Sequence, residues 1–60
     1  MDRLIREVVS ACDVRVGDLL ELGDLRRYVL DVETTADGTA VYLRDIAVAM
    51  APGVRITVQR

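Results

Sequence analysis

The chain has 60 residues, of which 52% are hydrophobic and 30% charged, and its formal net charge is −2. This length fits one small domain over residues 1–60, and the hydrophobic content excludes an intrinsically disordered chain. A single cysteine excludes an internal disulfide, and the absence of histidine argues against a zinc site made by this chain alone. Every apolar run is too short to span a membrane and no secretory signal is visible, so we expect a cytoplasmic protein.

Size and composition together predict self-association. A domain of 60 residues buries only about 60% of the surface that its unfolded chain exposes, which leaves its stability marginal. Small domains gain stability from disulfides, metal ions or association with further chains, and this composition leaves the last of these. All eight basic residues are arginine, and Lys, Asn, His, Phe and Trp are absent, a bias typical of the GC-rich genome of a bacterium or its phage.

The first predicted element is an amphipathic helix over residues 2–12. Asp2 is a favourable N-cap residue, and the segment is about three turns long, which is too short to be stable alone in water. Its apolar side is therefore expected to pack on a sheet or a neighbouring subunit, with Cys12 as a small buried hydrophobic residue. The apolar positions, spaced by three and four residues, are Leu4, Ile5, Val8, Val9 and Cys12.

Short strands are predicted after this helix. A turn at Gly17-Asp18 precedes a strand over residues 19–22, and Gly23-Asp24 ends that strand. The next strand is expected to run without interruption from about residue 26 to residue 34, where it joins the clearest pattern in the chain.

That pattern is a β-hairpin over residues 28–45. Its two strands, residues 28–34 and 39–45, alternate apolar and polar side chains, which indicates one buried face on each strand. The turn at residues 35–38 contains Asp37-Gly38, which supplies the positive φ angle that a tight return needs. The side chains expected to face the core from the first strand are Tyr28, Leu30 and Val32.

Residues 46–51 fit either a strand or a short helix, since alanine and methionine favour helices and Asp45 suits an N-cap. Pro52-Gly53 ends the run too soon for a normal helix, which favours the strand. Its bulky side chains then face the core, while Ala47, Ala49 and Ala51 form a second apolar side that another element can approach closely. A last alternating strand is predicted over residues 54–58.

The runs Val14–Leu22, Tyr28–Val32 and Pro52–Val58 resemble the strand order of small SH3-like barrels over about residues 14–58. A helix followed by five bent strands is also similar to the Sm-like fold of ring-forming RNA-binding proteins. This chain has no asparagine or lysine to match their RNA contacts, so the resemblance implies their architecture alone. The expected fold is mainly β, of the α+β class: a short N-terminal helix packed on a strongly bent, four- to five-stranded antiparallel sheet, SH3-like or Sm-like in outline.

The reactive residue types in this sequence argue against catalysis. Without histidine or lysine, acid–base catalysis would fall to carboxylates and two tyrosines, and the carboxylates lie in turns, caps and solvent-facing strand positions. The four glycines are dispersed one to a turn, so no phosphate-binding loop is present. We therefore expect no enzyme activity, no catalytic or metal-binding residues and no cofactor.

The sequence favours a non-enzymatic protein-interaction or assembly module that self-associates, such as a small structural or accessory protein of a bacterium or a phage virion. The expected partner is a second copy or another protein, with no membrane and no small molecule involved. The residues expected at this interface are Leu4, Val8, Tyr42, Ala47, Ala49 and Ala51.

The alternative is a nucleic-acid-binding small barrel, because arginine side chains suit phosphate groups. The residues of this alternative are Arg26, Arg27, Arg44 and Arg55. Acidic residues on the same strands favour ion pairs instead, so this alternative ranks second.

Overall fold

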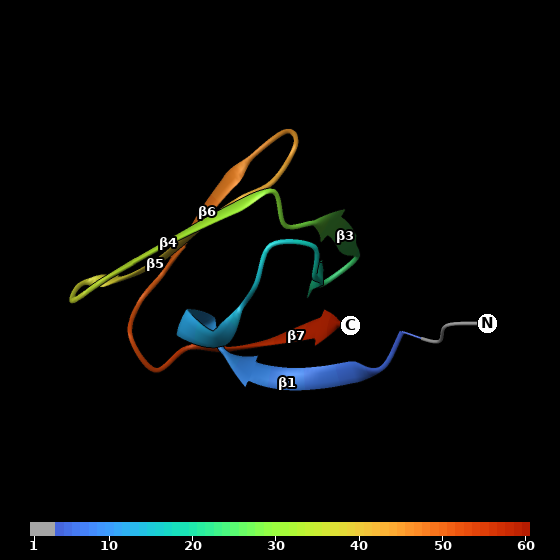
Figure 1. The fold of residues 1–60 in the computed structure, drawn as a ribbon, viewed down its shortest axis with the longest axis horizontal. Helices are drawn as coiled ribbons and strands as arrows, with labels where there is room; N and C mark the ends of the chain where they lie inside the picture. The colour runs from blue at the N-terminus through green and yellow to red at the C-terminus, as the bar shows by residue number, and fades with distance from the viewer. Residues whose placement is uncertain (1–3) are drawn as a thin grey trace.

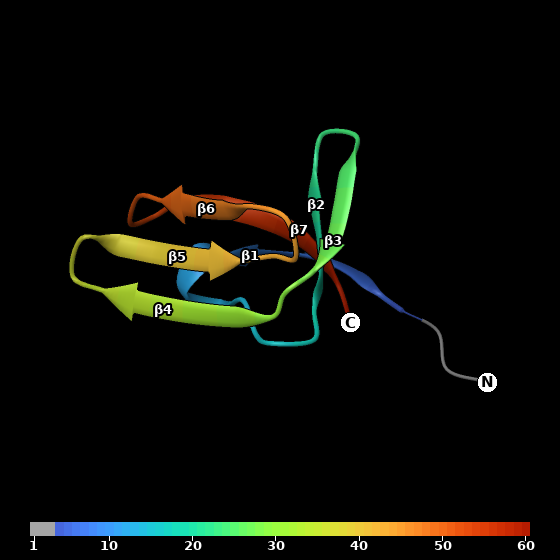
Figure 2. The ribbon, with the colours of Figure 1, turned by 90° about the horizontal axis from the view of Figure 1, so that it is seen from above.

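The computed structural model describes residues 4–60, which form seven short strands and one 3-10 turn (Figure 1). The strands pair into a four-stranded antiparallel sheet of order β1-β7-β2-β3 and a three-stranded antiparallel sheet of order β4-β5-β6. The β2–β3 hairpin runs across the strands of the three-stranded sheet (Figure 2). The elements are β1 (Arg6–Ser10), η1 (Ala11–Asp13), β2 (Leu19–Leu22), β3 (Leu25–Tyr28), β4 (Asp31–Thr35), β5 (Gly38–Tyr42), β6 (Ala47–Met50) and β7 (Arg55–Gln59).

The expected helix packed on a single bent barrel sheet is wrong. Residues 4–60 contain no α-helix, and their strands form two separate sheets that do not close into a barrel. The molecule is a small all-β domain, and no helix of residues 4–60 has the length and apolar character that crossing a membrane requires.

The hydrophobic core lies between the two sheets. Leu20 and Val58 reach it from the four-stranded sheet, Val41 and Met50 from the three-stranded sheet, and Val29 from the connection between them. Alternation along each strand sends every second side chain inward, as the pleat of a strand requires. The buried apolar residues are Ala11, Val14, Leu20, Val29, Val41, Leu43, Met50 and Val58.

Within the segment predicted as a helix over residues 2–12, residues 6–10 form β1 and the next residues form η1 instead. β1 pairs antiparallel with β7, with Val8 opposite Thr57 and Val9 opposite Ile56. β-Branched valines suit a strand, and backbone partners from the far end of the chain override the local helical pattern. The predicted cap Asp2 lies outside the described residues.

Cys12 was expected to be buried, and this prediction is also wrong. In η1 the buried residue is Ala11, which is 3% exposed, whereas Cys12 is exposed. The change from helix to strand and turn shifts the inward position by one residue and leaves the thiol at the surface.

The single strand predicted over residues 26–34 is divided at a corner between β3 and β4. The Val29 amide donates to the Asp18 carbonyl at 2.8 Å, and the next amide, Leu30, donates to the Tyr42 carbonyl at 2.9 Å. Two consecutive amides thus bond to Asp18, which directly precedes β2, and to Tyr42 of β5, in the other sheet. The corner turns Val29 inward and leaves Tyr28 and Leu30, both expected in the core, 58% and 57% exposed.

The later strands follow the predicted alternation, but the strand predicted over residues 39–45 is shorter: β5 ends at Tyr42, and residues 43–46 connect it to β6. The tight turn between β4 and β5 is confirmed, with Gly38 at a φ angle of +142°. Residues 47–50 form a strand, with Met50 buried and Ala49 exposed, and residues 55–59 form the last strand. β2 spans Leu19–Leu22, the range predicted for it.

Candidate protein-interaction surface

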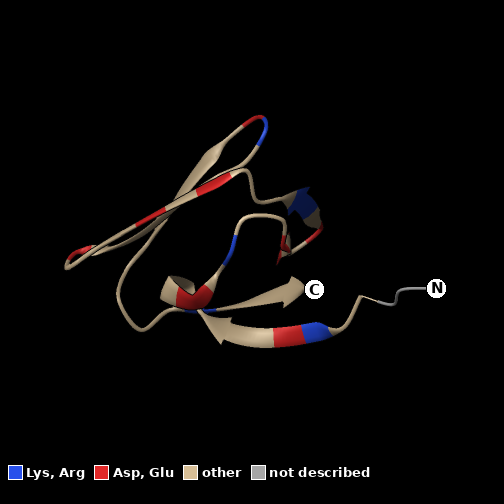
Figure 3. Cartoon of the chain, viewed as in Figure 1, with Lys and Arg blue, Asp and Glu red and all other residues tan. Residues whose placement is uncertain are grey.

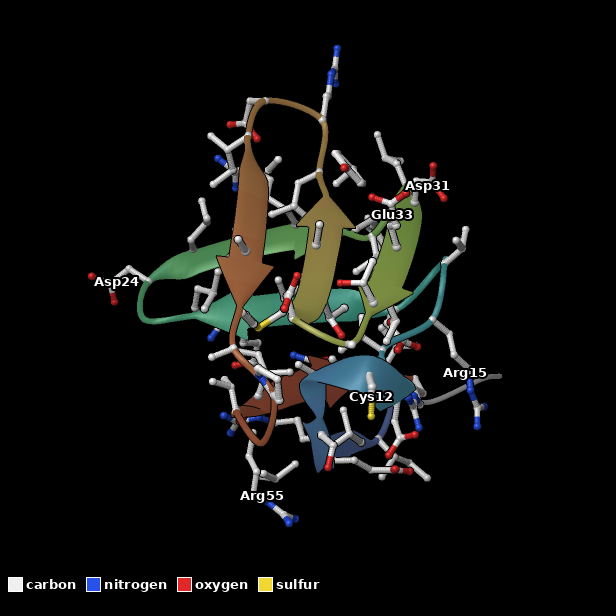
Figure 4. All side chains as sticks on the ribbon, turned by 90° about the vertical axis from the view of Figure 1, so that its left-hand side faces the viewer. Cys12, Arg15, Asp24, Asp31, Glu33 and Arg55 are labelled. Atoms are coloured by element: carbon white, nitrogen blue, oxygen red, sulfur yellow. The ribbon has the colours of Figure 1, made fainter. Side chains whose placement is uncertain are left out.

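The outer face of the three-stranded sheet carries mostly very small side chains along β5 and β6. The register places Ala40 beside Ala49 and Tyr42 beside Ala47, and all four point away from the core residues Val41 and Met50. Figure 4 shows this sheet from its outer side. We call this surface the alanine face; its residues are Gly38, Ala40, Tyr42, Ala47, Ala49 and Ala51.

Acidic residues border the alanine face along β4. Asp31 pairs with Tyr42 and Glu33 pairs with Ala40 across the β4–β5 ladder, so both carboxylates lie on the outer side (Figure 4). Neither forms a salt bridge with a residue of the described chain, 4–60. The surface is therefore negative at the β4 side and uncharged at the β6 side.

A shallow hollow of about 180 Å³ lies at the turn end of this surface. Pockets that hold drug-sized molecules are usually about 300–1,000 Å³, so this hollow suits one protruding side chain better than a small-molecule ligand. It is lined by Glu33, Thr35, Asp37, Gly38, Thr39, Ala40, Ala49 and Met50.

Four of the six predicted interface residues lie together on the alanine face: Tyr42, Ala47, Ala49 and Ala51. The other two belong to the four-stranded sheet or to the segment that precedes it. Val8 is in β1 and 57% exposed, and Leu4 comes just before β1 and is 50% exposed. The predicted set is thus divided between two surfaces.

The four predicted nucleic-acid residues do not gather on one surface. Arg26 lies 3.9 Å from Glu21, and Arg27 lies 3.5 Å from Asp45, so both take part in ion pairs. Arg44 and Arg55 come before and after β6, at opposite ends of that strand. Arg44 lies in the connection between β5 and β6 and Arg55 begins β7, and β5 and β7 belong to different sheets.

Glu21 is the centre of a polar cluster on the outer face of the four-stranded sheet. Arg6 donates two hydrogen bonds to its carboxylate at 3.0 and 3.2 Å, and Gln59 donates a third at 3.0 Å. The pKa of Glu21 is lowered chiefly by the Gln59 hydrogen bond, with the Arg6 hydrogen bond and the charges of Arg6 and Arg26 acting in the same direction, while burial opposes them. The cluster holds three neighbouring strands together.

Replacing Gln59 by leucine should raise the pKa of Glu21 toward the ordinary glutamate value of about 4.3. A depressed folded-state pKa stabilises the protein above the unfolded-state pKa, and that contribution is lost as the pH falls through the folded-state value. Acid unfolding of Gln59→Leu should therefore begin at higher pH. Carboxyl ¹³C NMR titration measures the shift directly. Arg55→Ala, outside the cluster, should leave the Glu21 titration unchanged, and an unaltered titration in Gln59→Leu would contradict the assignment.

A second ion pair joins Asp18 to Arg60. Asp18 is 6% exposed and accepts from the Arg60 guanidinium at 3.2 Å and from the Arg15 amide at 2.9 Å. The pKa of Arg60 is raised, mainly by the hydrogen bond to Asp18. Arg60 also donates to the Asp13 carbonyl at 2.7 Å, so the pair fastens the loop after η1 to the end of β7. The hydrogen bonds of the Asp18 carboxylate thus connect segments of the fold.

The structure exposes apolar residues that the sequence pattern did not place at the surface. Tyr28 and Leu30 flank the corner between the sheets, and Val16 lies on the loop that pairs with it through the Gly17–Val29 hydrogen bond of 2.9 Å. No local sequence signal marks this exposure, because the change of inward direction at Val29 depends on its hydrogen bond with the distant Asp18.

No grouping of three or more His, Cys, Asp or Glu side chains suited to a metal ion occurs within residues 4–60. The exposed thiol of Cys12 lies beside a second hollow, of about 230 Å³, between η1 and the β4–β5 turn. The alanine face has the features of a contact surface: small apolar side chains, one tyrosine and an acidic border.

Comparison with known protein families, curated proteins and solved structures finds no match to this chain.

Proposed function

We propose that this domain is a non-enzymatic assembly module that associates with further copies of itself through the three-stranded sheet, on the side of β6 and the alanine face. The observation that carries this proposal is an exposed sheet face without charge at its β6 side, in a chain where 30% of the residues are charged. Small side chains allow another backbone to approach closely, and Tyr42, which is 39% exposed, supplies an aromatic contact beside them.

The marginal size of the domain supports the same proposal. A chain of 60 residues has a total stability of only about 3–9 kcal/mol, so association that covers exposed apolar surface adds a sizeable fraction of it. Exposed Ile46, at 44%, lies next to β6 and gives such surface to cover. Because the sheets do not close into a barrel and no family matches, no function of SH3-like or Sm-like proteins enters the proposal.

Nucleic-acid binding receives less support. Two of its four arginines are neutralised by Glu21 and Asp45, and the remaining two are separated by the length of β6. A phosphate-binding surface needs several unpaired cations on one face, because the affinity grows with the number of phosphates neutralised.

The proposal predicts that the mass in solution rises above the 6.6 kDa of one chain as concentration increases through the micromolar range. Sedimentation equilibrium measures this mass directly, and thermal unfolding at two concentrations provides a second measurement, since association makes the melting temperature concentration-dependent. A constant mass of one chain together with a concentration-independent melting temperature would refute self-association.

A further inference from the structure

We propose that the strand that pairs with β6 is β6 of a second copy, antiparallel and related by a two-fold axis at Val48. Two three-stranded sheets then become one six-stranded sheet. This inference rests on the proposed self-association and specifies its geometry.

β6 differs from the other sheet edges of the described chain in carrying no charge. The sheet orders leave β1 and β3 at the edges of one sheet and β4 and β6 at the edges of the other. Proteins protect exposed edges with charged residues or proline, because unpaired backbone groups invite another strand. β1, β3 and β4 each contain two charged residues, whereas β6 is Ala-Val-Ala-Met (Figure 3).

The backbone groups of β6 that remain free follow from the β5–β6 register. The Leu43 amide donates to the Ile46 carbonyl at 2.8 Å, which makes these two residues a hydrogen-bonded pair. Alternation along an antiparallel ladder then directs the backbone groups of Val48 and Met50 toward β5. The contact of the Met50 carbonyl with the Gly38 position agrees with this phase. The amides and carbonyls of Ala47 and Ala49 consequently point away from the sheet, and we call them the free edge of β6.

A two-fold axis at Val48 matches this free edge with itself. Ala47 of each copy lies opposite Ala49 of the other, and each of the two pairs exchanges two backbone hydrogen bonds. Val48 faces its own counterpart on the inner side of the sheet, and Ile46 faces Met50. The half-buried Val48 and the exposed Ile46 therefore gain apolar neighbours in the same step.

The four-stranded sheet provides a surface under the added strand. Figures 2 and 4 show the tip of the β2–β3 hairpin, marked by Asp24, extending past the β6 side of the three-stranded sheet. The half-buried side chains of Leu22 and Leu25 lie at this end of the hairpin. A strand added to β6 lies across that end and covers apolar surface in addition to forming the ladder.

The charge distribution favours a second copy at β6 over any other pairing of the three-stranded sheet. In the six-stranded sheet the acidic β4 strands occupy the two outer edges, five strand spacings or about 24 Å apart. That separation exceeds the Debye length of about 8–10 Å at physiological salt, so Asp31 and Glu33 do not repel their counterparts. Pairing through β4 would instead place these carboxylates next to each other.

Charge substitutions on the free edge test the register. Ala47→Lys with Ala49→Lys places like charges opposite each other in both pairs of the interface and should weaken association about tenfold or more. Ala47→Lys with Ala49→Glu places opposite charges in both pairs and should restore association to near the unmodified level. Both positions are exposed, so each variant should remain folded by circular dichroism. Sedimentation equilibrium gives the dissociation constants.

The matched control introduces the same two charges on the β1 edge, as Val8→Lys with Ser10→Lys, and should leave association unchanged. If the control abolishes association, the interface is β1 and the inference is overturned. If the unmodified chain associates but the double-lysine β6 variant associates equally well, the β6 pairing is overturned and the proposed function stands. An unmodified chain that is monomeric throughout overturns both.

A disulfide provides a second measurement that does not depend on charge. In a Cys12→Ser background, Val48→Cys brings two thiols opposite each other at the two-fold axis and should form a covalent dimer under mild oxidation. Ala49→Cys in the same background lies opposite Ala47 and should remain largely uncoupled. A greater dimer yield from Ala49→Cys than from Val48→Cys would refute the proposed register.

Discussion

Leu20→Ala should destabilise the domain by about 2–5 kcal/mol, enough to unfold a large fraction of molecules at room temperature. Leu20 is 1% exposed and lies on the central strand β2, where its side chain fills the space between the two sheets. Truncation removes apolar contacts and leaves a cavity that two short sheets cannot collapse to fill. The total stability of a 60-residue domain is only about 3–9 kcal/mol, so one such change removes a large fraction of it.

Leu30→Ala is the matched control for this prediction. Leu30 is 57% exposed at the corner between the sheets, and the same substitution there should change stability by about 0.5 kcal/mol or less. Urea unfolding followed by far-UV circular dichroism measures both variants. Equal losses in Leu20→Ala and Leu30→Ala would contradict the location of the core.

Gly38→Ala should cost about 2–5 kcal/mol, combining backbone strain with overpacking. Gly38 has a φ angle of +142°, which side-chain-bearing residues rarely adopt, and an added Cβ would collide with the Met50 carbonyl. Relief of the collision requires the backbone at Gly38 or at Met50 to shift, which disturbs the contact between β5 and β6. The substitution should therefore also displace the strand that we propose as the contact between copies.

Gly53→Ala separates the two contributions. Gly53 has a φ angle of +86°, but no atom lies within 4 Å of the added Cβ. The substitution should therefore lower the stability only by the backbone strain, about 1–2 kcal/mol. Thermal unfolding in the same buffer measures the loss of stability in both variants. If Gly53→Ala proves as destabilising as Gly38→Ala, the close contact between Gly38 and Met50 is not the cause.

The sequence predicts those strands whose signals are local. Gly23-Asp24 marks the end of β2, Asp37-Gly38 marks the return between β4 and β5, and Pro52-Gly53 separates β6 from β7. Alternation correctly places Val41 and Met50 inward and Ala49 outward. Each of these features depends on a few neighbouring residues, and a tight hairpin fixes its own register.

Features that depend on distant partners could not be predicted in this way. Residues 6–10 carry apolar side chains at spacings that fit a helix, and only the ladder to β7 makes them a strand. The corner at Val29 similarly depends on Asp18, and missing it reversed the inferred direction of Tyr28 and Leu30. The division of the chain into two sheets follows from these two long-range contacts.

The candidate surface was predictable in part for the same reason. The exposure of Ala47, Ala49 and Tyr42 follows from alternation within one hairpin and its neighbouring strand. The grouping of Arg44 with Arg55 depended on how distant segments pair, and the strands nearest to them, β5 and β7, belong to different sheets. Alternation within single strands thus identified the exposed face of the three-stranded sheet, whereas the pairing of distant strands could not be inferred from the sequence.

The position of β7 between β1 and β2 constrains the order in which a nascent chain acquires structure. Sheet β4-β5-β6 is a meander of consecutive strands, so its contacts are short in sequence and close at little entropic cost once residue 50 has emerged. The four-stranded sheet is different, because β1 and β2 are joined only through β7. During synthesis, β1 therefore has no pairing strand until residues 55–59 have emerged, and its valines remain without a sheet partner over that interval.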